Sequence, residues 1–109
     1  GMDVALDMYE TDDAIVIKVA VPGVKPEDIQ VTVTGETLTI KGETKREENV
    51  KEQSYVRRER NYGKFCRSIT LPGNVTPDET KAEFEQGVLA LTVPKTEEVK
   101  PKSIRIKAK

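Results

Sequence analysis

The segment Ala14-Ile15-Val16-Ile17-Lys18-Val19-Ala20-Val21-Pro22-Gly23 decides the fold class of this 109-residue chain. Its aliphatic side chains at positions 15, 17, 19 and 21 recur with a period of two. In an extended backbone that period places them on one face, so the segment predicts a half-buried β-strand. Pro22 and Gly23 then end the strand, because both residue types favour turns.

The same period recurs along most of the chain. The aliphatic side chains at 29, 31 and 33, the turn at Gly35-Glu36 and residues 37–41 together predict a hairpin. Further strands are expected over residues 65–71, 80–85 and 88–93, with one more near the N-terminus before the turn at residues 11–13. About seven or eight short strands with no convincing helix predict an all-β, immunoglobulin-like antiparallel β-sandwich.

Composition supports one such domain. Val, Ile and Thr make up 31 of the residues, a β-branched content that favours strands, and the absence of Trp predicts a thin aliphatic core. We expect the sandwich to cover residues 1–95 and a flexible C-terminal extension to cover residues 96–109. Gly1 before Met2 indicates a cloning remnant, so we expect the natural chain to extend further upstream.

Two features do not fit a simple sandwich. Residues 43–62 are rich in charge, with Val50 and Val56 their only aliphatics, and so long a loop needs an explanation. Within it, Tyr55-Val56-Arg57-Arg58-Glu59-Arg60 could be a short strand whose partner lies on another chain. Arg67 stands on the largely apolar face of its expected strand, and needs a carboxylate or carbonyl partner, an interface, or an edge position.

The sequence offers little for catalysis. The chain has no His, which excludes Ser-His and Cys-His arrangements. Cys66 lies between Lys64 and Arg67, but a lone cysteine is better explained as a small strand residue. The glycines stand singly at turns, and the paired carboxylates lack the spacing of a calcium loop. We therefore expect a binding protein, not an enzyme, without cofactor or metal.

Charge and hydropathy limit the classes of binding partner that we expect. The net charge of -1 and pI near 5.6 provide no global basic field, so we expect no nucleic acid partner. No apolar run approaches the length of a membrane span, which predicts no membrane partner and a cytoplasmic location. The tail is different, because Ile104 and Ile106 are two residues apart in a basic stretch and form a two-pronged apolar plug.

Three segments together resemble the α-crystallin domain of the small heat-shock proteins, in the bacterial and plant style. They are Val21-Pro22-Gly23-Val24-Lys25-Pro26-Glu27-Asp28-Ile29, Phe65-Cys66-Arg67-Ser68-Ile69-Thr70-Leu71-Pro72 and Ala82-Glu83-Phe84-Glu85-Gln86-Gly87-Val88-Leu89. The resemblance implies an ATP-independent chaperone of the stress response, a holdase that binds unfolding client proteins and prevents their aggregation. Family members usually carry an N-terminal arm, and we expect this sequence to lack most of it.

The resemblance also implies how the chain associates with itself. In the implied homodimer, the loop strand pairs with the partner's N-terminal strand, and the interface involves Leu6, Met8, Tyr9, Tyr55, Val56, Arg57, Arg58 and Arg67. Higher oligomers are implied by the Ile-x-Ile motif, with Ile104 and Ile106 docking on a neighbour in a groove formed by Ile29, Val31, Val33 and Ala82. The alternative is a co-chaperone-like adaptor that binds a folded partner, a class that generally lacks the long loop and the tail motif.

Overall fold

The computed structural model describes residues 4–44, Val56 and residues 63–109. The strands are β1 (Ala5–Glu10), β2 (Ala14–Ala20), β3 (Ile29–Thr34), β4 (Thr37–Thr44), β5 (Gly63–Thr70), β6 (Lys81–Glu85) and β7 (Val88–Pro94). The described residues also form three short 3₁₀ turns: η1 (Pro26–Asp28) and η3 (Pro77–Glu79) precede β3 and β6, and η4 (Glu97–Val99) follows β7. The all-β prediction is therefore confirmed.

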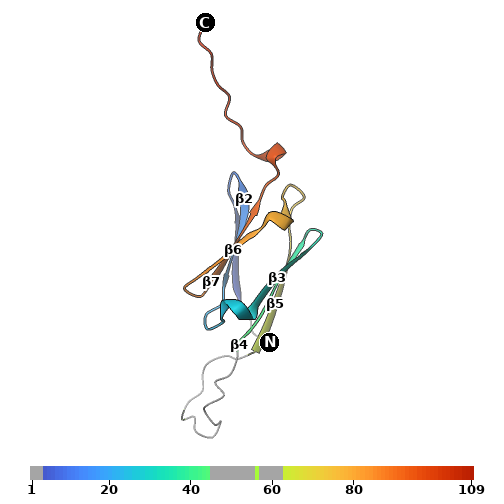
Figure 1. Ribbon diagram of the computed structural model, residues 1–109, viewed down its shortest axis with the longest axis vertical. Helices are drawn as coiled ribbons and strands as arrows, with labels where there is room; N and C mark the ends of the chain where they lie inside the picture. The colour runs from blue at the N-terminus through green and yellow to red at the C-terminus, as the bar shows by residue number, and fades with distance from the viewer. Residues whose placement is uncertain (1–3, 45–55, 57–62) are drawn as a thin grey trace.

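These strands form two antiparallel sheets. Sheet A has the order β1-β2-β7-β6 and sheet B the order β3-β4-β5. Figure 1 shows the sheets stacked as a sandwich, with the C-terminal extension leaving one end of it. β4 runs to Thr44, which pairs with Gly63. The expected start of the loop at residue 43 is therefore wrong, because residues 43 and 44 belong to β4. Each sheet leaves two strand edges without a partner among the described residues.

The core lies between the sheets and is aliphatic, as the composition predicts. The side chains at alternate positions of the central strands are fully buried, which is the packing that a period of two requires. Ile17, Val19, Leu38, Ile40, Leu91 and Val93 each have 0% of their surface exposed. Phe65 is the aromatic member of this core, with 4% exposed.

The β6–β7 hairpin depends on a two-residue turn of left-handed backbone. Gln86 and Gly87 have φ angles of 51° and 78°, and Glu85 pairs directly with Val88. Two successive positive φ values match the twist of a tight hairpin, and glycine adopts them without steric cost. The Gly87 carbonyl then accepts a hydrogen bond of 2.8 Å from the Val21 N–H, which ties the hairpin to the end of β2.

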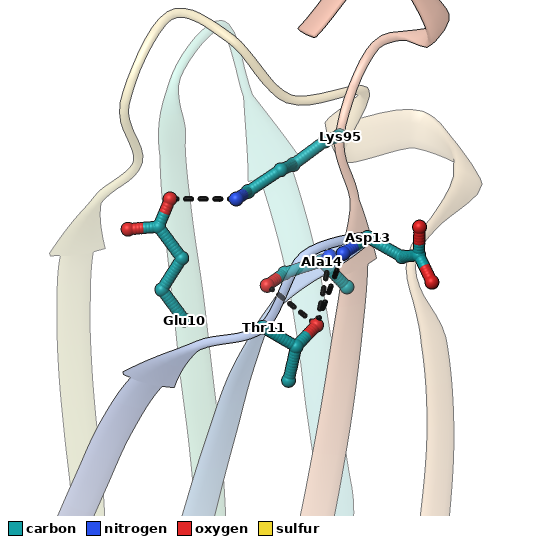
Figure 2. Close-up of polar contacts among 5 residues, drawn as sticks. All are labelled: Glu10, Thr11, Asp13, Ala14 and Lys95. Carbon is teal, nitrogen blue, oxygen red and sulfur yellow. Dashed lines mark hydrogen bonds and ion pairs between the residues drawn. The ribbon is translucent and has the colours of Figure 1, made fainter. Parts of the chain in front are cut away.

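The turn between β1 and β2 positions the start of the extension. Thr11 Oγ1 accepts hydrogen bonds from the N–H groups of Asp13 (3.3 Å) and Ala14 (3.0 Å), as Figure 2 shows. Lys95 follows β7, and its N–H donates to the Asp13 carbonyl at 2.8 Å. Its ammonium lies 2.7 Å from Glu10 Oε1. The chain therefore leaves the sandwich from a point bonded to both ends of this turn.

Candidate protein interaction site

The candidate site is built from the two edge strands β3 and β6. Arg67 of β5 contacts Val4, the residue before β1, so the β5 edge of sheet B lies beside the β1 edge of sheet A. Because the two sheets are stacked, β3 and β6 form the opposite side of the sandwich. Neither has a second strand partner within the described ranges, so each presents free backbone N–H and C=O groups.

Apolar side chains line the inner faces of these two strands. Val31 pairs with Ile40, and Ala82 pairs with Leu91, both partners fully buried, so the paired side chains share the inner face. Residues two positions before or after Val31 and Ala82 on the same strands also point inward. We call this set the β3–β6 rim, and it consists of Ile29, Val31, Val33, Ala82 and Phe84.

The rim residues remain open to solvent although they face the core side. Ile29, Val31 and Phe84 are only partly buried against the core, Ala82 is exposed, and 36% of Val33 is exposed. Residues on the central strands at the same depth are 0% to 5% exposed. The four groove residues that the resemblance implies therefore lie on the inward faces of two edge strands, one in each sheet, which have no second strand partner among the described residues. Phe84 joins them, and its position two residues after Ala82 is the signal that places it on the same face.

The Ile-x-Ile motif lies away from the rim of its own chain. Ile104 is 87% exposed and Ile106 is 93% exposed, among the most exposed large apolar residues described. Figure 1 shows the extension projecting from the end of the sandwich. At its base, Lys100 Nζ donates to Glu97 Oε1 at 2.9 Å, and this hydrogen bond raises the pKa of the Lys100 ammonium. The described chain thus carries both an apolar rim and an unburied apolar plug.

The predicted dimer interface is described only in part. Leu6, Met8 and Tyr9 lie in β1, which pairs with β2 on one side and has no strand partner on its other side among the described residues. Met8 and Tyr9 are 48% and 46% exposed, whereas Leu6 packs against the core. Val56 is fully exposed, and Tyr55, Arg57 and Arg58 lie outside the described residues.

Two of the alternatives for Arg67 hold together, because it is exposed on the edge strand β5 and it also has a carbonyl partner. Its Nη1 donates to the Val4 carbonyl at 3.0 Å, across the two sheets. The strand register confirms that Arg67 is on the apolar face of its strand, because it pairs with the buried Ile40 on the inner face of sheet B. The bond joins the edge strand β5 to the segment before β1, which the sequence could not specify, because the two residues are far apart in the chain.

Other chemistry is sparse on the described surface. Cys66 is an exposed free thiol on the outer face of sheet B, opposite Lys41. Across residues 4–44 and 63–109 no His, Cys, Asp or Glu side chains gather as a metal site would require. The helical turns of these residues have neither the length nor the apolar character of a membrane span.

Comparison with known proteins agrees with this architecture. Residues 7–108 match the Hsp20/alpha crystallin family. The chain is 41% identical over 101 residues to small heat shock protein C2 of Rickettsia felis, covering 93% of this chain and 66% of that protein. The chain covers 60% of spore protein SP21 of Stigmatella aurantiaca, to which it is 39% identical, so it spans less than two thirds of the length of these two relatives.

Two solved structures resemble the whole fold. Heat shock protein 16.0 from Schizosaccharomyces pombe superposes with a TM-score of 0.81 at 34% identity, covering 100% of both chains. A small heat-shock protein from Xylella fastidiosa gives a TM-score of 0.82 at 32% identity over 98% of each. Sequence and fold agree, and the chain belongs to the Hsp20/alpha crystallin family.

Proposed function

We propose that this chain is an ATP-independent holdase, which binds unfolding proteins through apolar surface and keeps them from aggregating. Family membership supports a chaperone role. The observation that carries the proposal is the pairing of an open apolar rim with an exposed Ile-x-Ile motif in one chain. A protein that exposes apolar strand edges would itself aggregate unless copies of its own chain cover them reversibly.

The tail is proposed to provide that cover. Ile104 and Ile106 share one face of an extended backbone, as Val31 and Val33 do on β3 and Ala82 and Phe84 do on β6. Burying two isoleucines contributes roughly 3 to 6 kcal/mol, and ordering three tail residues costs about the same in backbone entropy. One docked tail is therefore close to break-even, and stable assemblies need several tails engaged together.

The proposed dimer uses the opposite side of the sandwich. In the part of the chain that the structure describes, no strand pairs with the outer edge of β1, and the strand expected within residues 55–60 of a partner would pair with it. This exchange removes an exposed edge from each subunit. Because tail docking and strand exchange use different sides, dimers can form without occupying the rim.

Suppression of light scattering by a heated client protein tests the holdase function. We expect the chain to lower the scattering in proportion to its concentration, equally with and without ATP, because the proposed mechanism only covers apolar surface. The proposal is wrong if the chain leaves scattering unchanged, or acts only when ATP is present. Tight stoichiometric binding to one folded protein, without suppression, would instead favour the adaptor function.

A further inference from the structure

We propose that the outer face of β6 selects the docked tail by charge. Glu83 and Glu85 would bind Arg105 and Lys107 of a second copy of this chain while that copy's isoleucines occupy the β3–β6 rim. The inference rests on the proposed docking of the tail, and it adds a second, electrostatic half to the site.

The alternation of both segments brings these charges to one face. In β6, Ala82 and Phe84 face inward, so Glu83 and Glu85 face outward. In the tail, Arg105 and Lys107 alternate with the two isoleucines. An extended tail placed along the free edge of β6 with its isoleucines inward must present Arg105 and Lys107 on the outer face of sheet A.

A hollow on that outer face suits a long cationic side chain. It has a volume of about 470 Å³ and is lined by Lys18, Glu83, Glu85, Gln86, Val88 and Ala90. Val88 and Ala90 supply an apolar surface, and 37% of Val88 is exposed. Lys and Arg bury their aliphatic stems on such a surface while the charged group stays near water and near a carboxylate.

The charges involved are free to pair with another chain. Among the described residues, the structure shows no ion pair for Glu83, Glu85, Arg105 or Lys107. Glu83 of β6 pairs with Ala90 of β7, and Ala90 pairs with Lys18 of β2, so one strand separates Glu83 from Lys18. The Lys18 ammonium lies 5.8 Å from the centre of the ring of Tyr9, which is in β1, on the side of β2 away from β6. Neutralisation of the two carboxylates from within the domain is therefore incomplete.

The third outward residue of β6 restricts the register. Lys81 would repel a basic side chain placed opposite it, because like charges directly across a pair of strands are destabilising. The favoured register therefore sets Arg105 and Lys107 beside Glu83 and Glu85. After Glu98 the tail has only basic charges, so no acidic residue of the tail opposes this placement.

A charge swap tests the inference. The receptor is the full chain carrying Ile104→Ala and Ile106→Ala, so that its own tail does not compete, and the ligand is a fluorescent peptide of residues 98–109. Glu83→Lys with Glu85→Lys in the receptor is expected to weaken peptide binding about five- to tenfold, since two partly exposed ion pairs are lost. A peptide with Arg105→Glu and Lys107→Glu should lose a similar factor on the original receptor, and should recover most of it on the reversed receptor.

Matched controls separate specific pairing from overall charge. Asp7→Lys with Asp12→Lys makes the same change in net charge on β1 and its following turn, at the opposite edge of sheet A from β6, and should leave the affinity within about twofold. Unfolding midpoints of all receptors check that the exposed substitutions preserve the fold. The charge inference is overturned if reversal at 83 and 85 matches this control, or if the swapped pair shows no recovery.

The proposed tail docking can fail separately. A peptide with Ile104→Ala and Ile106→Ala should bind at least tenfold more weakly than the original peptide, because it loses both apolar groups. Equal affinity of the two peptides would reject the isoleucine plug itself. Loss of binding without isoleucines, combined with no effect of charge reversal, would reject only the electrostatic half.

Discussion

At the scale of single residues, Gly42 and Phe65 show how closely the inner face of sheet B is packed. They pair directly across β4 and β5, and a Cβ at Gly42 would lie 2.5 Å from two carbon atoms of the Phe65 ring. Because Phe65 is only 4% exposed, the ring has little room to move. Gly42 is therefore required by contact, not by an unusual backbone angle.

We expect Gly42→Ala to lower the free energy of unfolding by about 1 to 3 kcal/mol, the usual cost of overpacking a core. Urea denaturation measures the change. Gly73→Ala is the matched control, since its Cβ would meet only Glu36 Oε1 at 3.4 Å, and its effect should stay within about 0.5 kcal/mol. Equal effects of the two substitutions would contradict the contact argument. Adding Phe65→Leu should recover part of the loss at Gly42.

Arg67 makes a second prediction at this scale. Arg67→Ala removes the donor to the Val4 carbonyl, and we expect a loss of about 1 kcal/mol, since the side chain is partly in water. Lys64→Ala, a cation on the outer face of the same strand, is the control and should change stability little. Identical urea midpoints for the two variants would show that the bond to Val4 contributes nothing.

At the scale of elements, the four strand edges without a partner in residues 4–44 and 63–109 are expected to bind different partners. β1 and β5 lie on one side, and β3 and β6 lie on the other. Interior strands are satisfied on both sides and stabilise the fold, whereas edge strands retain unpaired backbone groups. Association by strand addition is therefore expected at the edges, with different partners on the two sides.

Shortening the long loop tests the proposed dimer. Thr44 pairs with Gly63, so replacing residues 45–62 with Asn-Gly should close β4 and β5 as a tight hairpin. We expect this variant to keep the sandwich, seen by circular dichroism, and to sediment as a monomer at concentrations where the original chain is a dimer. A dimer that persists after this replacement would contradict the proposed strand exchange.

At the scale of the whole molecule, weak individual contacts favour reversible assembly. The exposed isoleucines lie on an extension that projects from the sandwich, so one tail can reach a neighbouring copy (Figure 1). Since one plug is near break-even, each further docking within an assembly is effectively intramolecular and adds to the total. In the proposed mechanism, subunits then leave the assembly and expose their rims to client proteins.

We expect Ile104→Ala with Ile106→Ala to retain dimers and to lose the higher species. Light scattering coupled to size-exclusion chromatography, across a range of protein concentrations, measures both. Lys102→Ala with Lys109→Ala is the control, because it changes the tail but keeps both isoleucines, Arg105 and Lys107, and it should retain a larger fraction of higher species. An unchanged mass distribution in the isoleucine variant would contradict the plug.

Much of the fold could be predicted because the alternation of apolar and polar side chains along a strand can be read from the local sequence. The period of two in residues 14–21 specifies both the strand and its buried face, and Pro-Gly or Gly-containing turns mark where strands end. The choice of Ile29, Val31, Val33 and Ala82 as one groove came instead from the resemblance to the small heat-shock proteins, since alternation alone does not say which strands meet. Boundaries were less certain, since Glu43 and Thr44 become strand only by pairing with β5.

The sequence by itself determined the strands, their inward faces, the apolar spacing of the tail and the absence of histidine chemistry. The tertiary structure alone decided which edges lie side by side, and so placed Phe84 in the rim, paired Arg67 with Val4 and set Gly42 beneath Phe65. The reason is physical: side-chain alternation depends on neighbours in the chain, whereas sheet order and stacking depend on contacts between distant segments.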